Sequence, residues 1–360
     1  MCFAIAVPSW FIGNTIPIIG GPVSAIVLGI LVTLLFPALT SKKFANGRGF
    51  EAGVKFTSKK LLQFSIILLG FEMNFYNVVT VGRQSLLVML FTFAAAFLTV
   101  YFLGKALKLH GATTVLIGVG TSVCGASAIA AAAPVVGAKD EDISQAVSTI
   151  FLFNIIAVFI FPILGRAMHM DDTSFGMWAG TAINDTSSVV AAGASWSNVA
   201  GSNAALAFAT IVKLTRTLMI VPITLALAIY TSSRRKGDSV TTGSNASTSN
   251  SASTNGSAST SDSAKAGDNK FSFVKIFPWF VIFFVAAALV NTFTGLPASV
   301  SSGLTEAGKF LIVMAMGAIG LNTNLKKLIS NGARPLLLGV SCWAVVAVVS
   351  VIVQKGLLRQ

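Results

Sequence analysis

The sequence predicts an all-α polytopic membrane protein with about 10–11 transmembrane helices. Of its 360 residues 54% are hydrophobic and only 10% are charged, whereas a soluble domain carries about 25% charged residues. Apolar runs of about 20 residues, the length that crosses a bilayer as a helix, recur along the chain. Both observations favour a membrane bundle over a soluble core.

Eleven apolar spans are expected. They lie at roughly 2–18, 20–37, 60–80, 85–104, 112–137, 143–165, 174–194, 203–230, 276–294, 303–321 and 335–354. The first span is short and is interrupted by Pro8 and Pro17. No Lys or Arg precedes Lys42, so this segment lacks the basic flank of a signal peptide and is interpreted as a true span.

The positive charges predict the orientation. With the N-terminus inside, 18 of the 25 Lys and Arg residues fall in cytoplasmic connections, which fits the positive-inside rule. Four fall outside and three within spans, among them Lys213 and Arg216. The net charge of +13 is therefore mostly a topology signal, and a nucleic-acid partner is not expected.

Residues 231–270 are rich in Ser, Thr, Asn, Gly and Ala, which predicts a disordered cytoplasmic linker. The linker would separate a membrane segment over 1–230, with eight spans, from a second over 271–360, with three. No soluble catalytic domain is evident, so an enzyme is not expected. Cys2, Cys124 and Cys342 lack the spacing of a metal site or a disulfide framework, and no cofactor or metal is expected.

Two internal similarities are visible. Leu69–Phe75 resembles Ile319–Leu325 at an offset of 250 residues, and the two spans concerned run in opposite directions, which indicates an inverted-topology repeat. Thr121–Ile129 resembles Thr181–Val189 as well. In the eleven-span count these two segments are parallel, so either the match is chance or one segment is re-entrant. The sequence leaves both readings open.

The polar stretch from Trp178 to Arg216 predicts a transport site. It places one carboxylate, two cations and several hydroxyls in an apolar region, where an ionisable side chain costs about 2.5–3.5 kcal/mol to insert. Asp185 lies in an Asn-Asp-Thr-Ser-Ser run whose short polar side chains disfavour a helix interior, so an unwound or kinked span is expected there. A simpler interpretation is a cap at a span end.

Lys213 and Arg216 are three residues apart and share a helix face far from either span end. They either anchor an anionic substrate or form a structural ion pair with Asp185. The small residues of Gly118–Ser127 serve either close helix packing or a second broken helix facing Asp185. Glu306 and Lys309 are expected to pair with each other.

The candidate substrate-binding residues are Lys213, Arg216, Thr186, Ser187, Ser188, Ser127 and Asn184, with Asp185 as the ion-coupling carboxylate. Further candidates are Cys124, Gly125, Asn154, Glu72, Asn74 and Asn324.

Four motifs carry a close resemblance to the YeiH family, which covers the chain from about Leu61 to the C-terminus. They are Thr121–Ile129, Ser148–Asn154, Trp178–Ala192 and Ala209–Leu218. The Ser/Thr-rich insert and the weak first span depart from the family pattern but lie outside these motifs.

The YeiH proteins are bacterial inner-membrane proteins that are often labelled sulfate exporters. The family looks related to the cation–proton antiporter and anion transporter group. This resemblance implies inverted five-helix repeats with crossed broken helices, and a core that moves against a scaffold.

The resulting expectation is a secondary active transporter of a small anion, sulfate or a sulfonate-like oxyanion, which exports it by alternating access. Its partners would be that anion, a coupling proton or cation, and the lipid bilayer, with a homodimer as an open option. The alternatives are a cation–proton antiporter that uses Asp185 and Lys213, and a non-transporting membrane sensor or structural protein.

Overall fold

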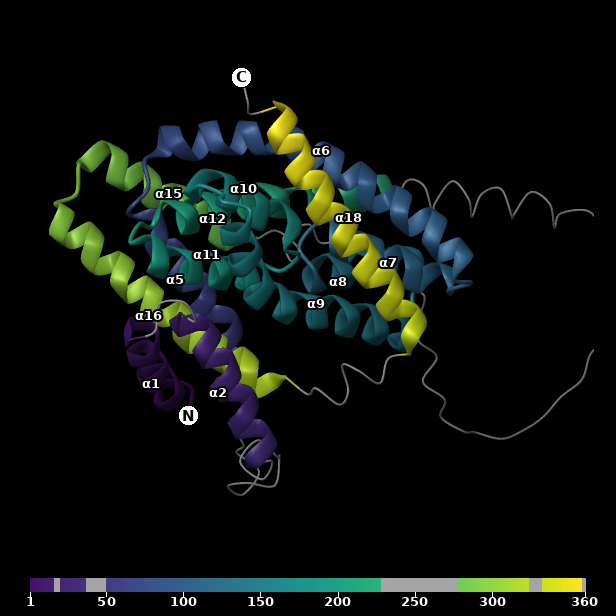
Figure 1. The fold of residues 1–360 in the computed structure, drawn as a ribbon, viewed down its shortest axis with the longest axis horizontal. Helices are drawn as coiled ribbons and strands as arrows, with labels where there is room; N and C mark the ends of the chain where they lie inside the picture. Colours follow the sequence, from purple (N-terminus) through teal and green to yellow (C-terminus); the bar gives the residue numbers. More distant parts are fainter. Residues whose placement is uncertain (16–19, 37–49, 228–277, 324–331, 358–360) are drawn as a thin grey trace, which may run out of the picture.

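The computed structural model describes residues 1–15, 20–36, 50–227, 278–323 and 332–357. Within these ranges the ordered elements are helices and no strand occurs, which confirms the all-α prediction. The predicted linker at 231–270 and Asn324 lie outside the described residues. The helices form two groups, which we call the scaffold group and the hairpin group (Figure 1).

The scaffold group contains the N-terminal helices together with α15 and α16. It comprises α1 (Cys2–Thr15), α2 (Gly21–Leu35), the continuous helix of α4 (Glu51–Phe56), η1 (Thr57–Leu61) and α5 (Leu62–Gly70), then α15 (Trp279–Thr294) and α16 (Ala298–Asn322). Helices α2 and α16 touch main chain to main chain, because a Cβ on Gly29 would lie 2.6 Å from the carbonyl oxygen of Gly317. Such contact needs small residues and makes this pair rigid.

The hairpin group contains the rest of the bundle. It comprises α6 (Phe75–Ala106), α7 (Gly111–Ser122), α8 (Ala126–Val136), α9 (Asp140–Ala167), α10 (Asp172–Ala182), α11 (Thr186–Ala200), α12 (Ala204–Leu218) and α18 (Ala333–Leu357). A helix over 220–227 continues the path of α12. In Figure 1, α18 passes over α6 and α9, and α10–α12 lie on the side of the hairpin group that faces α15 and α16.

Helices α7 and α8 form a re-entrant hairpin. The imidazole of His110 and the hydroxyl of Thr113, at the start of α7, lie 3.1 and 2.6 Å from Oδ1 of Asp142, at the start of α9. The chain therefore returns along α8 to the end from which α7 departed. Each arm has 12 or 11 residues, which is about 17–18 Å and only about half the thickness of a bilayer core.

Helices α10 and α11 form a second re-entrant hairpin. The indole nitrogen of Trp196, near the end of α11, donates to Oδ1 of Asp172 at 2.7 Å, at the start of α10. The Trp196 ring also stacks on Phe175, with 4.0 Å between the ring centroids. The guanidinium of Arg166, at the end of α9, lies 5.8 Å from the same indole ring. Since α9 has 28 residues, about 42 Å, the two hairpins enter from opposite ends of the bundle.

Two of the expected spans, 112–137 and 174–194, are thus hairpins, and counting them as full crossings was wrong. With this correction α7–α8–α9 and α10–α11–α12 are repeats of opposite orientation, since each unit now crosses only once. The re-entrant reading of the match between Thr121–Ile129 and Thr181–Val189 therefore agrees with the observed helices, and the two segments lie at the breaks of two oppositely oriented hairpins. In the predicted topology, treating these spans as hairpins moves Lys139 from the outside to the inside and Arg166 from the inside to the outside. The number of positive charges on each side is therefore unchanged.

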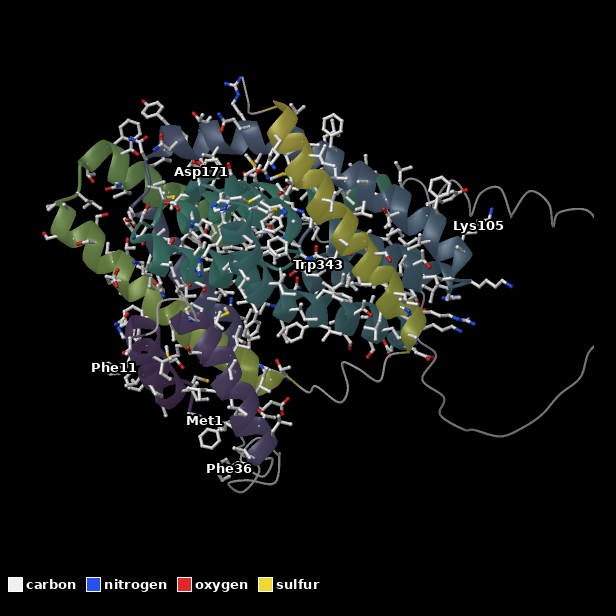
Figure 2. All side chains as sticks on the ribbon, in the orientation of Figure 1. Met1, Phe11, Phe36, Lys105, Asp171 and Trp343 are labelled. Atoms are coloured by element: carbon white, nitrogen blue, oxygen red, sulfur yellow. The ribbon has the colours of Figure 1, made fainter. Side chains whose placement is uncertain are left out.

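The perimeter of the bundle is apolar. Phe11 on α1 and Phe36 after α2 are 66% and 55% exposed and point away from the bundle (Figure 2). Among the described residues, five helical segments are long and apolar enough to cross a membrane: Phe75–Ala106, Asp140–Ala167, Ala204–Leu227, Ala298–Asn322 and Ala333–Gly356. Exposed apolar side chains on such helices match a hydrocarbon environment.

Candidate functional site

The hairpin tips are helix breaks, which confirms the predicted broken helices: one lies at the predicted Asn-Asp-Thr-Ser-Ser run, and the other agrees with the broken-helix alternative for Gly118–Ser127. Between α7 and α8 the chain turns at Val123–Gly125, where Gly125 takes φ +69°, a left-handed conformation that suits glycine. Between α10 and α11 it turns at Ile183–Asp185. Asp185 caps α11, and its carboxylate accepts from the main-chain N–H of Ser187 at 3.0 Å and from the hydroxyl of the same residue.

Lys213 of α12 ties the two tips together. Its side chain is fully buried, and Nζ donates to the carbonyl oxygens of Val123 and Ile183, both at 3.0 Å, and to that of Asn184. An ammonium group has three donors and no acceptor. All three donors are used on main-chain carbonyls, so none is left for another ligand.

Arg216, one turn later, repeats this arrangement. Its Nε donates to the carbonyl oxygen of Ser122 at 2.7 Å, and its Nη2 donates to that of Thr121. Its Nη1 donates to the carbonyl oxygens of Thr181 at 2.5 Å and Ile183 at 3.3 Å. The guanidinium is buried and links the end of α7 to the end of α10.

These contacts decide the electrostatics of the tips. The C-terminal ends of α7 and α10 carry unpaired carbonyls and about half a negative charge each. The two cations of α12 neutralise both ends. The N-terminal ends of α8 and α11 carry the opposite partial charge and are not neutralised by these cations, although the carboxylate of Asp185 caps the end of α11.

A pocket of about 390 Å³ lies in front of these N-termini, between the two helix groups. The hairpin group contributes the polar residues Ser127, Asn154, Asp185, Thr186 and Ser187 and the apolar residues Ala126, Val147, Ile150 and Phe151. The amide oxygen of Asn154 accepts from the main-chain N–H of Asp185 at 3.2 Å and so fixes the second tip to α9. The scaffold residues that close the pocket are Ser58, Lys59, Leu62, Gln63, Ile66, Phe280, Ile319 and Asn322.

Five predicted site residues thus meet in one pocket, and the other candidates at the tips lie behind them. Ser188 and Asn184 do not line the pocket, and Oδ1 of the buried Asn184 has no hydrogen-bond partner among the described residues. Cys124 and Gly125 form the first tip. A ligand in the pocket would experience the electric field of Lys213 and Arg216. It would not contact the N–H groups of these two side chains, which are bound to main-chain carbonyls.

The ion pair offered for Lys213 and Asp185 is not formed. No contact within 4.0 Å between this ammonium and this carboxylate occurs in the described structure, so that interpretation is wrong. The partners of the Lys213 ammonium are the main-chain carbonyls of the tips and not the Asp185 carboxylate. The expected pair of Glu306 and Lys309 is confirmed, with 2.7 Å between Nζ and Oε1.

Glu72 and Asn74 lie elsewhere, at the end of the bundle from which α10–α11 enters. They line a separate pocket of about 560 Å³. Asn74 caps α6 by accepting from the main-chain N–H of Tyr76, and Glu72 accepts from the amide of Asn203 at 2.9 Å. This last bond joins the two helix groups at that end.

Sequence reasoning missed the scaffold wall of the pocket, represented by Lys59 and Gln63. These residues precede an ordinary apolar run, and nothing in their spacing marks them. Asn322 carries a signal, because it aligns with Glu72 in the 250-residue repeat.

Comparison with known proteins gives a consistent result. A family model described as conserved hypothetical protein 698 matches residues 1–339. A UPF0324 membrane protein of Fusobacterium nucleatum is 40% identical over 370 residues, which cover 99% of this chain and 96% of the relative. One from Streptococcus pyogenes serotype M18 is 43% identical over 360 residues, with the same coverage. A third, from Streptococcus mutans, is 42% identical over 353 residues, covering 97% and 94%. The chain belongs to the conserved hypothetical protein 698 family, whose curated relatives here are UPF0324 membrane proteins.

Proposed function

We propose that the protein is a secondary transporter that carries a small oxyanion, sulfate or a sulfonate, through the membrane by alternating access. One observation carries the proposal. Two hairpins of opposite orientation present the N-termini of α8 and α11 to one pocket, while two buried cations neutralise the opposite helix ends.

The charge balance at the tips favours an anion. Two cations and one carboxylate, Asp185, meet in this region. The cations outweigh the half charges of the two C-terminal helix ends, and Asp185 offsets the remainder. The positive N-terminal ends of α8 and α11, which are ready-made anion sites, therefore set the sign of the charge in front of the tips. The hydroxyls of Ser127, Thr186 and Ser187 supply neutral donors suited to the oxygens of a sulfate or sulfonate group.

Asp185 supplies a coupling step. Its carboxylate occupies the N–H and hydroxyl donors of Ser187, which an oxyanion at the tip of α11 would also use. A proton on Asp185 weakens it as an acceptor and removes its repulsion of the anion. Proton binding and anion binding then favour each other, as linkage requires.

The two helix groups supply the moving parts. The pocket lies between them, and α11 contacts α2 and α16 along the seam. Movement of the hairpin group against the scaffold group would expose the tips to one end of the bundle and then to the other. The scaffold wall contains Ser58, Lys59 and Asn322, from the end predicted to be cytoplasmic.

The resemblance to the YeiH family supports an oxyanion substrate, the export direction and a place in the bacterial plasma membrane, and the distribution of the positive charges supports an inside N-terminus. We propose these finer assignments together with the transport function. Neither catalysis nor a cofactor forms part of the proposal, and a homodimer is compatible with it.

A second candidate is a cation–proton antiporter, because the pocket contains the carboxylate of Asp185 next to the amide of Asn154. Both groups offer oxygen ligands to a hard cation. The positive N-terminal ends of α8 and α11, which face the pocket, oppose this candidate, and flux measurements separate the two.

The test is flux of radiolabelled sulfate and methanesulfonate in proteoliposomes with an imposed pH gradient. The wild-type protein should show saturable, pH-dependent anion flux. Ser187→Ala should raise KM about tenfold or more, which is the effect of losing one hydrogen bond to a charged ligand. Ser302→Ala, an exposed position on α16, is the matched control and should behave as wild type.

Asp185→Asn should retain anion binding but lose the pH dependence of flux. If no anion moves, and Asp185→Asn instead abolishes proton exchange driven by Na⁺ or K⁺, the antiporter is the correct function.

A further inference from the structure

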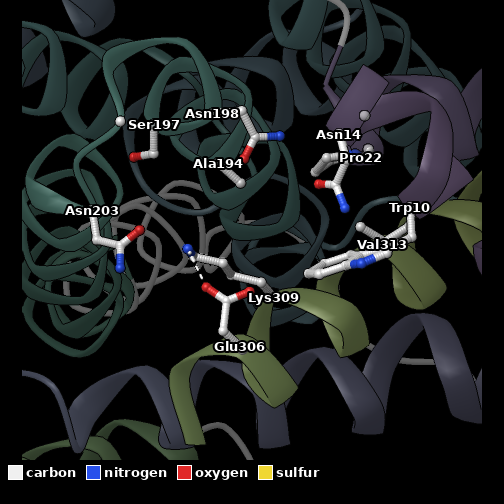
Figure 3. A pocket seen from close by; sticks show the side chains of 13 residues that line it. Trp10, Asn14, Pro22, Ala194, Ser197, Asn198, Asn203, Glu306, Lys309 and Val313 are labelled. Carbon is white, nitrogen blue, oxygen red and sulfur yellow. Dashed lines mark hydrogen bonds and ion pairs between the residues drawn. The ribbon is translucent and has the colours of Figure 1, made fainter. Parts of the chain in front are cut away.

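A second pocket, of about 330 Å³, lies at the end of the bundle that carries Glu72 and Asn203 (Figure 3). It is bordered by α1, α2 and α16 of the scaffold group and by the end of α11 and the start of α12. Its polar and aromatic lining consists of Trp10, Asn14, Ser197, Asn198, Asn203, Glu306 and Lys309.

Several side chains of this lining offer hydrogen-bond donors, and the hydroxyl of Ser197 has no partner among the described residues. Ser197 is only 4% exposed, and its Oγ finds no hydrogen-bond partner within the described part of the chain. A buried hydroxyl without a partner costs about 1–3 kcal/mol, so such atoms call for a ligand or water. The side-chain amides of Asn14 and Asn198 and the indole of Trp10 add further N–H donors.

Lys309 gives the pocket a cation that can be released. Its Nζ lies 2.7 Å from Oε1 of Glu306. The side chain of Lys309 is 18% exposed and that of Glu306 is 56% exposed. The ammonium is therefore the deeper member of the pair. An anion can replace the carboxylate at Nζ, and Glu306 can turn into water at little cost because exposed ion pairs are weak.

The second pocket lies on the same seam as the first. Helix α11 starts with Thr186 and Ser187 in the first pocket and reaches Ser197 in the second, ten residues or about 15 Å further along. Helix α16 likewise joins Asn322 to Glu306. Both pockets therefore border the interface between the two helix groups, near its opposite ends.

We propose that this second pocket is an anion site at the far end of the transport path, where Lys309, Ser197 and Asn198 hold a small oxyanion before or after it visits the hairpin tips. The identity of its ligand rests on the function proposed above. Glu306 competes with the anion for Lys309 and keeps the site from binding too tightly.

The experiment is calorimetric titration of the full-length protein in nanodiscs with sulfate and with methanesulfonate. The wild-type protein should bind at two sites. Lys309→Gln should weaken one site at least about tenfold, because it removes a charge-assisted hydrogen bond. Glu306→Gln should tighten the same site. Ser187→Ala should weaken the other site and leave this one unchanged.

The results separate failure of this inference from failure of the transport function. If Lys309→Gln and Glu306→Gln both give wild-type isotherms while Ser187→Ala weakens binding, the second site does not exist and the first one does. If the wild-type protein binds neither anion, both proposals fall. Tighter binding by Glu306→Gln cannot result from misfolding, so it tests the site even if Lys309→Gln folds poorly.

Discussion

The substitution Arg216→Met tests the structural role of the buried cations. It keeps the length and apolar stem of the side chain but removes the guanidinium, which holds the carbonyl oxygens of Thr121, Ser122, Thr181 and Ile183. We expect the hairpin tips to separate and the folded state to lose stability.

The size of the loss in unfolding free energy follows from the four carbonyl oxygens that Arg216→Met leaves without a donor. Each buried acceptor without a partner costs about 1–3 kcal/mol, so four of them set an upper range of about 4–12 kcal/mol. Water that enters the vacated space will satisfy some of these carbonyls. Breaking a buried charged contact typically costs about 3–5 kcal/mol, and we expect the loss in the free energy of unfolding to fall in that range.

Equilibrium unfolding in mixed detergent and SDS micelles measures this loss. A second readout is the maleimide reactivity of Cys124, which lies in the first tip and is buried, in a background without Cys2 and Cys342. Arg216→Met should make Cys124 reactive. The matched control is Arg83→Met, an exposed cation on α6. If Arg216→Met has wild-type stability and an unreactive Cys124, Arg216 does not hold the ends of α7 and α10 together.

Two further predictions concern the hairpins. Single cysteines at Lys108 and Lys139 should be labelled from the same side of the membrane, and one at Met168 from the opposite side; full spans would instead place Lys108 with Met168. Trp196→Phe should cost about 1–2 kcal/mol of unfolding free energy in the same SDS assay, because it removes the donor to Asp172 and keeps an aromatic ring to stack on Phe175. Stability equal to wild type would show that this bond does not hold the base of the hairpin.

The composition and the apolar runs were enough to predict the class of fold, but not its re-entrant parts. Residues 111–136 have the length and composition of a crossing helix, and hydropathy does not report whether a chain continues or turns back at a short break. The match of Thr121–Ile129 with Thr181–Val189 was the real clue. It conflicted with the span count because that count treated a hairpin as a crossing.

The candidate site was predictable where it depends on residue type. The Asn-Asp-Thr-Ser-Ser run marked a helix break, and Asp185 and its neighbouring hydroxyls do line a pocket. The partners of Lys213 and Arg216 were not predictable, because they are main-chain carbonyls, which every residue possesses. The cost of burying two cations indicated that they need negative partners, and the exposed carbonyl ends of α7 and α10 meet that need.

The central claim is that an oxyanion binds at the N-termini of α8 and α11. Selenate, a heavier analogue of sulfate, can be located by its anomalous scattering in crystals of the protein. The account predicts an anomalous peak within hydrogen-bond distance of Ser127 and Ser187, with the carbonyl contacts of Lys213 and Arg216 intact. A selenate ion bound directly to these two cations in place of the carbonyls, or no ion at the tips under saturating selenate, would contradict it.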